Sequence, residues 1–138
     1  MTAALRVLLV EDDADHVFLV RRALRDLAGV EATVEVATDG EQASQRLARA
    51  RFEPGGPPQL VLLDLKMPRM DGLEVLRRIR ADEAAAGLPV VVLTSSERQD
   101  DREEALRLGA TWFVCKPTDG HRFRSEIQQL ADRWAVPA

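Results

Sequence analysis

The sequence has very little cysteine and no excess of positive charge. Cys115 is the single cysteine among 138 residues, so no internal disulfide forms within the chain. A protein without disulfides fits a reducing compartment. The formal net charge is −4, and composition therefore gives no support for a basic nucleic-acid-binding surface.

Long hydrophobic runs are also missing. The apolar runs have the length of β-strands and fall well short of a membrane span. The opening residues, Met1 to Ala4, lack the pattern of a secretory signal. We therefore expect a cytoplasmic protein. Its 138 residues suit one domain covering 1–138, with a core over about 5–133 and no output domain.

What the chain does contain is a regular alternation of short apolar runs and longer amphipathic stretches. The apolar runs, interpreted as strands, cover 5–10, 32–37, 60–63, 90–93 and 112–115. Apolar residues recur at helical spacing in the stretches that follow them. This pattern predicts an α/β protein with a doubly wound, five-stranded parallel sheet. A proline- and glycine-rich surface loop is expected at 52–58.

Polar residues follow four of the predicted strands. They are Glu11-Asp12-Asp13, Asp64, Thr94-Ser95 and Lys116-Pro117. The carboxyl ends of parallel strands meet at one edge of an open α/β sheet, and such sheets bind ligands there. We therefore expect these side chains to form a single site.

Each of these polar residues has a chemical interpretation and a simpler one. The first acidic cluster would bind a hard divalent ion, Mg²⁺ above all, although Asp13 also suits a helix N-cap. Asp64 would be a metal ligand and a nucleophile toward phosphorus, or else a loop-capping aspartate. Thr94 and Lys116 would hold phosphoryl oxygens. Alternatively, Thr94 would start a helix and Lys116 would be an ordinary surface lysine. Because all of them occur at strand ends, we favour a phosphoryl site.

Four segments resemble the motifs of response-regulator receiver domains, and the resemblance covers nearly the whole chain. They are LLVEDD, LVLLDLKMPRMDG, PVVVLTSS and GATWFVCKP. The resemblance implies a stand-alone, chemotaxis-regulator-like protein with a flavodoxin-like (βα)5 fold and strand order 2-1-3-4-5. It also implies that Asp64 accepts a phosphoryl group from a sensor histidine kinase in a Mg²⁺-dependent reaction. Transfer and slow dephosphorylation would be self-catalysed, so a turnover enzyme is not expected.

The same resemblance assigns the metal ligands. Asp12 would bind Mg²⁺ directly and Glu11 would bind it through water. Asp64 and the backbone carbonyl of Lys66 would be the other protein ligands of the ion. Asp13 lies one position beyond the acid pair. The Lys66 side chain is less expected beside the site, and it would alter the lifetime of the phosphoryl group.

The resemblance also assigns a phosphate-binding and switch set. Thr94 and Lys116 would contact the phosphoryl group, and movement of Thr94 would let Phe113 turn inward. The surface of the fourth helix, fifth strand and fifth helix would then change. Phe113 stands where better-known relatives have tyrosine, and its alternative role is that of an ordinary core aromatic. The peptide before Pro117 would be cis and would aim Lys116 at the acceptor.

Other residues receive structural interpretations. Pro68 and Gly72 are expected to set the turn after Asp64, since glycine permits backbone angles that other residues resist. His16 and His121 are isolated histidines without a partner pattern. Neither is expected to bind a metal or to accept a phosphoryl group.

A narrower resemblance is to the stand-alone regulators that partner bacterial phytochrome-type histidine kinases. It rests on VEDDADHVFLVRRAL, the proline–glycine loop, PVVVLTSS and the C-terminal RWAVP. It implies a homodimer through the fourth-helix, fifth-strand, fifth-helix face, with Trp112 and Trp134 as aromatic anchors. The alternative for Trp134 is packing against its own core.

Two functional classes remain open. One is a signalling receiver, and the other is a phosphorylation-independent protein-interaction module that keeps the fold. The complete set of acids, acceptor, threonine and lysine favours the receiver. An aspartate-nucleophile phosphohydrolase would need a second aspartate two residues after the nucleophile, where this chain has Lys66.

Overall fold

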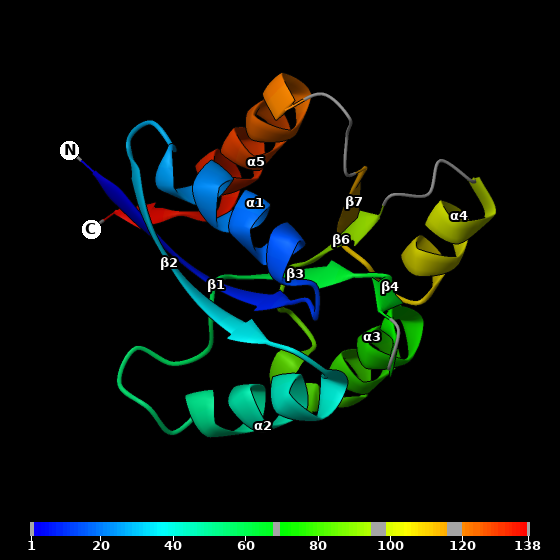
Figure 1. Ribbon diagram of the computed structural model, residues 1–138. Coiled ribbons are helices and arrows are strands. Elements are labelled where there is room, and N and C mark those ends of the chain that lie inside the picture. Colours follow the sequence, from blue (N-terminus) through cyan, green and yellow to red (C-terminus); the bar gives the residue numbers. More distant parts are fainter. Residues whose placement is uncertain (1, 68–69, 95–98, 116–119, 138) are drawn as a thin grey trace.

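A parallel sheet forms the centre of the computed structural model, which describes residues 2–67, 70–94, 99–115 and 120–137 (Figure 1). The elements along the chain are β1 (Ala3–Val10), α1 (Ala14–Arg25), β2 (Val30–Ala37), α2 (Gly40–Ala50), β3 (Leu60–Asp64), β4 (Lys66–Met67), β5 (Met70–Asp71), α3 (Gly72–Ala81), a 3-10 turn (Glu83–Ala85), β6 (Val90–Thr94), α4 (Gln99–Arg107), β7 (Trp112–Cys115), α5 (Gly120–Trp134) and β8 (Val136–Pro137). The long strands lie in the order β2-β1-β3-β6-β7. Counted along the chain, this is 2-1-3-4-5, so the predicted doubly wound fold is confirmed.

Helices cover both faces of the sheet. Figure 1 shows α1 and α5 on one side and α2 and α3 on the other. Leu60 and Leu62 of β3 belong to the core under α1 and α5, whereas Val61 and Leu63 belong to the core under α2 and α3. Both faces of β3 are buried, which explains why its residues from Leu60 to Leu63 are all apolar. None of the described helices is both long and apolar enough to cross a bilayer.

Aspartate residues start three of the helices. The Asp13 carboxylate accepts a hydrogen bond from the amide of Asp15 at 2.8 Å. Asp39 and Asp71 cap α2 and α3 in the same way. Each cap satisfies amides that have no partner within the helix. The simpler interpretation of Asp13, as a helix N-cap, is therefore confirmed.

The two ends of the chain lie side by side, a feature that the sequence pattern did not predict. β8 pairs antiparallel with the start of β1, where Ala3 faces Pro137 and Ala4 faces Val136. Figure 1 shows both ends at the same corner of the sheet. Trp134, just before β8, is partly buried and packs against the core under α1 and α5. Its alternative role as a core residue of its own chain is thus observed.

Two arginines, one on β1 and one on α3, hold loops in place. Arg6 of β1 donates to the carbonyl of Gly56 at 2.9 Å, which ties down the predicted proline–glycine loop. Arg80 of α3 donates to the carbonyls of Gly109 at 2.8 Å and Leu88 at 2.7 Å. Burial lowers the pKa of the Arg80 guanidinium from its ordinary value. These contacts hold the loops at the edge of the sheet opposite the predicted site.

Candidate functional site

Three buried polar side chains lie at the carboxyl edge of the sheet. Within the described part of the chain, Glu11, Asp64 and Thr94 are the polar or charged residues that are buried, with exposures of 0%, 3% and 1%. The strand register explains why they meet, since Val10 faces Leu63 and the next residues of those strands are Glu11 and Asp64. The sheet therefore brings together three of the predicted strand-end residues.

The acceptor candidate Asp64 ends β3 in a tightly packed segment. The amide of Leu65 donates to the carbonyl of Leu93 at 3.1 Å, which continues the β3–β6 pairing past Asp64. The amide of Gly72, at the start of α3, donates to the carbonyl of Leu65 at 3.2 Å. This arrangement holds the end of β3 between β6 and α3.

Gly72 is required here for a different reason from the one expected. Its φ is not in the left-handed region, so the expected need for an unusual backbone angle is wrong. Instead, a Cβ at Gly72 would lie 2.5 Å from the carbonyl oxygen of Asp64 and 2.6 Å from the Cα of Leu65. The absence of a side chain lets α3 begin directly against the backbone of Asp64. Pro68 lies outside the described residues.

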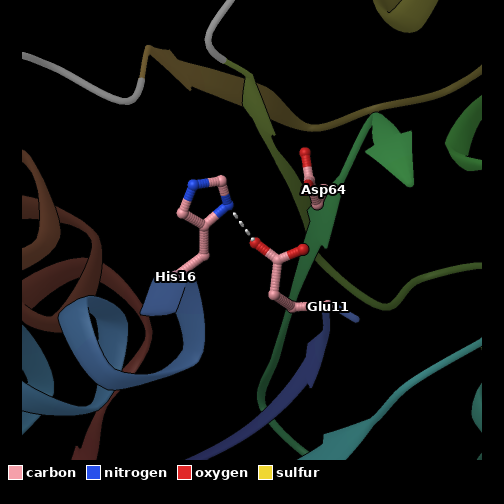
Figure 2. Close-up of side chains that lie close together, drawn as sticks. All are labelled: Glu11, His16 and Asp64. Atoms are coloured by element: carbon pink, nitrogen blue, oxygen red, sulfur yellow. Dashed lines mark hydrogen bonds and ion pairs between the residues drawn. The ribbon is translucent and has the colours of Figure 1, made fainter. Parts of the chain in front are cut away.

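Glu11 is paired with a histidine that the sequence analysis set aside. Figure 2 shows the His16 ring turned toward Glu11, with Nδ1 3.0 Å from Oε1. The other carboxylate oxygen, Oε2, accepts from the backbone amide of Asp12 at 3.2 Å. Both oxygens of this fully buried carboxylate therefore have partners.

Glu11, His16 and Asp64 form a donor set that fits a divalent cation. One ligand atom from each residue lies within 4.8 Å of the other two, and Figure 2 shows the three side chains converging from β1, α1 and β3. Two buried carboxylates this close together repel each other, and a bound cation offsets that repulsion. The residues present therefore fit a divalent cation at this edge of the sheet.

A local signal for His16 was present in the sequence. Asp13 caps the helix, so α1 begins at Ala14 and His16 falls in its first turn. Side chains on a helix lean toward its N-terminus, and that end of α1 lies beside the end of β1. The missing information was the angle between helix and strand, which depends on tertiary packing.

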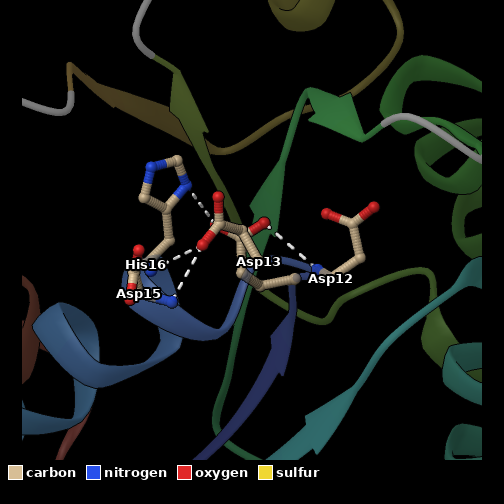
Figure 3. Close-up of polar contacts among 5 residues, drawn as sticks. Asp12, Asp13, Asp15 and His16 are labelled. Carbon is tan, nitrogen blue, oxygen red and sulfur yellow. Dashed lines mark hydrogen bonds and ion pairs between the residues drawn. The ribbon is translucent and has the colours of Figure 1, made fainter.

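The remaining predicted acids lie around this cluster. Asp12 is half-buried, and Figure 3 shows its side chain extending away from His16. Asp13 is exposed and occupied as the cap of α1, which Figure 3 also shows. Direct coordination of Mg²⁺ by Asp12 stays a prediction.

The two predicted lysines are placed only in part. The backbone of Lys66 lies in β4, where it pairs with Asp71. Lys66 follows Asp64 and Leu65 in the sequence. The role of its carbonyl as a metal ligand stays a prediction. Lys116 and Pro117 lie outside the described residues, as does the predicted cis peptide between them.

The predicted switch residue Phe113 lies on β7 beside α4. It is half-buried against the core, and its ring stacks on Trp112 with centroids 5.3 Å apart. The Cζ of Arg102, from α4, lies 5.0 Å from the centre of the Phe113 ring. Nη2 of the same arginine donates to Sγ of Cys115 at 2.9 Å. Arg102 therefore joins α4 to the strand that carries the predicted switch.

Comparison with known proteins agrees with this fold. The chain matches the response regulator receiver domain over residues 7–128. The probable methanogenesis regulatory protein FilR2 of Methanothrix harundinacea (strain 6Ac) is 35% identical over 131 residues, covering 93% of this chain and 82% of that protein.

Solved structures agree as well. The phosphorylated cyanobacterial phytochrome response regulator RcpA is similar with a TM-score of 0.82 and 29% identity, over 96% of this chain and 94% of that one. The receiver domain of sensor histidine kinase PA1611 from Pseudomonas aeruginosa PAO1, with magnesium in its active-site cleft, has a TM-score of 0.76 and 32% identity, over 96% and 98% of the two chains. This chain belongs to the response regulator receiver domain family.

Proposed function

We propose that this protein is a two-component response regulator in which Asp64 accepts a phosphoryl group from a sensor histidine kinase. The observation that carries the proposal is the position of Asp64, a carboxylate only 3% exposed at the end of β3. Glu11 and Thr94 flank it at the ends of the neighbouring strands. A carboxylate at the carboxyl edge of a parallel sheet is well placed for nucleophilic attack on a ligand bound there.

In the proposed reaction, an oxygen of Asp64 forms a bond to phosphorus while the bond between phosphorus and the donor breaks. The donor is a phosphohistidine nitrogen in the kinase, or a carboxylate oxygen in acetyl phosphate. The Thr94 hydroxyl donates to a phosphoryl oxygen, and Lys116 supplies a positive charge. Water later attacks the phosphorus, which releases inorganic phosphate and restores the Asp64 carboxylate. The protein thus catalyses its own modification and demodification and is not a turnover enzyme.

The proposed cofactor is Mg²⁺, held by Asp12, Asp64, Glu11 and the backbone carbonyl of Lys66. A bound divalent ion offsets the negative charge shared by the carboxylates and the incoming phosphoryl group. The buried pair of Glu11 and Asp64 supports the proposal, because burial makes an unneutralised carboxylate pair costly. Magnesium in the active-site cleft of the similar PA1611 receiver domain supports it further.

The experiment uses acetyl phosphate as donor and intact mass as readout. We expect the wild-type protein to gain the mass of one phosphoryl group with Mg²⁺ and to gain none after chelation by EDTA. Asp64→Asn should gain none under either condition. Asp26→Asn, which changes an exposed aspartate at the far end of α1, is the matched control and should behave as wild type. Equal modification of Asp64→Asn would contradict the assignment.

The proposed output is a change of the α4–β7–α5 surface, in which Phe113 turns inward. The alternative function is a phosphorylation-independent interaction module with the same fold. Amide NMR spectra with and without phosphorylation separate the two. We expect shifts in α4 and β7 as well as at Asp64, whereas shifts confined to the site would favour the interaction module.

A homodimer through the α4–β7–α5 face is a second part of the proposal. Trp112 of β7 is 55% exposed, which suits an aromatic anchor, whereas Trp134 is partly buried in its own chain. We expect light scattering after size exclusion to show a dimer that Trp112→Ala weakens. A wild-type monomer in both phosphorylation states would remove this interface.

The likeness to RcpA supports a phytochrome-type kinase as partner. We also propose a cytoplasmic location.

A further inference from the structure

We propose that His16 is a ligand of the divalent cation at the carboxyl edge of the sheet. Its imidazole nitrogen gives the site a preference for transition metals such as Ni²⁺ and Co²⁺ over Mg²⁺. The proposal deepens the proposed function and rests on it, because it requires a cation beside Asp64. Its basis is a cluster that combines one imidazole with two buried carboxylates.

The imidazole is placed as a ligand of a shared ion would be. Nδ1 of His16 lies 3.0 Å from Oε1 of Glu11, and one ligand atom of Asp64 lies within 4.8 Å of both groups. Ligand bonds of about 2.1 Å in an octahedral ion put adjacent ligand atoms about 3.0 Å apart and opposite ones about 4.2 Å apart. One ion therefore fits between the three groups after small adjustments.

The fold fixes the position of the ring. Asp13 caps the first turn of α1 and accepts from the amide of His16 at 3.4 Å, so the backbone that carries the ring is held. The His16 side chain is 39% exposed and the Glu11 side chain is 0% exposed. The ring is therefore more accessible to solvent than the carboxylate, and Figure 2 shows that it approaches Glu11 from α1.

A nitrogen ligand changes which ions bind well. Carboxylate, carbonyl and water oxygens suit Mg²⁺, whereas imidazole suits zinc, copper, iron and nickel. Mg²⁺ also gives up its water reluctantly and keeps several water ligands in proteins. A site with oxygen ligands alone would suit Mg²⁺. The imidazole of His16 adds a nitrogen ligand, which raises the affinity for transition metals much more than the affinity for Mg²⁺.

A simpler role for His16 makes the opposite prediction. If the ring only forms a hydrogen bond with Glu11, an incoming cation must displace it. Removal of the ring would then strengthen the binding of every divalent ion. A ligand role instead predicts selective weakening of the transition metals.

The experiment measures the binding of Ni²⁺ and Mg²⁺ by calorimetry at one fixed pH, on protein without an affinity tag. We expect His16→Asn to raise the Kd for Ni²⁺ at least about tenfold, with a much smaller effect on the Kd for Mg²⁺. His121→Asn is the matched control, because His121 lies on α5 and is the only other histidine in the sequence. It should bind both ions as wild type does.

A second readout detects the ligand directly. In the Co²⁺-loaded wild type, NMR should show a strongly shifted ring N–H signal that is lost in His16→Asn and kept in His121→Asn. Tighter binding of both ions by His16→Asn, or equal weakening of both, would overturn the ligand proposal. If Ni²⁺ binding is unchanged while Mg²⁺-dependent phosphorylation of Asp64 is intact, the proposal fails and the proposed function stands. If wild type binds no divalent ion, both fail.

Discussion

Gly72 packs directly against the backbone of Asp64. A Cβ on Gly72 would lie 2.5 Å from the Asp64 carbonyl oxygen, a separation that non-bonded atoms do not tolerate. The neighbouring atoms belong to the backbone at the end of β3, so no side-chain rotation relieves the contact. The start of α3 and the proposed phosphoryl acceptor are therefore positioned together.

Gly72→Ala should accordingly destabilise the protein. We expect the free energy of unfolding to fall by about 1–3 kcal/mol, as for overpacking in a tight core. Urea denaturation measures the change. Gly87→Ala is the matched control, since a Cβ there would meet no atom within 4 Å. That variant should stay within about 0.5 kcal/mol of wild type, and equal losses in both variants would contradict the steric explanation.

Asp13→Ala should weaken the start of α1. The substitution removes the side-chain oxygen that accepts from the amides of Asp15 and His16, and the loss of such a cap costs about 1 kcal/mol of stability. Thermal or urea unfolding measures it. Asp13→Ser keeps an accepting oxygen and should recover most of the loss. No difference between the two variants would show that the cap does not stabilise α1.

Arg80→Met should destabilise the loops at the opposite edge of the sheet. The guanidinium donates to the carbonyls of Gly109 and Leu88, and hydrogen bonds from a charged donor are each worth about 1.5–3 kcal/mol. For the two bonds together we expect a loss of about 3 kcal/mol or more in urea unfolding. Arg80→Lys keeps the charge but loses the fork of donors, and should recover only a small part.

The effect of Arg80 on stability should not vary with pH near neutrality. Burial lowers the pKa of this cation, so its charged form is less favoured in the folded state than in the unfolded state. Stability linked to this group would therefore rise with pH, but only in the strongly alkaline range where arginine titrates. The difference between wild type and Arg80→Met should stay constant from about pH 6 to 9. A difference that changes across that range would point to another titrating group.

Thr94→Val should impair the proposed phosphoryl site without disturbing the sheet. Thr94 is 1% exposed at the end of β6, and valine has nearly the same shape without the hydroxyl. Loss of one hydrogen bond to a charged phosphoryl group should slow modification by acetyl phosphate by about tenfold or more. Thr94→Ser restores the hydroxyl and should recover the rate. A wild-type rate in Thr94→Val would remove Thr94 from the site.

Local sequence was sufficient for much of the fold. The apolar run of β3 is continuous because both of its faces are buried, and the alternation along β2 marks an edge strand. The polar residues that end β1, β3 and β6 were recognisable because a parallel sheet places such ends at one edge. Glu11, Asp64 and Thr94 were therefore predictable as neighbours from the sequence alone.

Tertiary structure decided the contacts between separate elements around those residues. The pairing of β8 with β1 involves only two residues on each strand, too few to produce a periodic signal. The need for glycine at position 72 comes from the approach of α3 to β3, not from a backbone angle. His16 meets Glu11 because α1 packs across the end of β1. Sequence determines periodicity, caps and strand ends, which are local properties, whereas distances between separate elements depend on how the whole core packs.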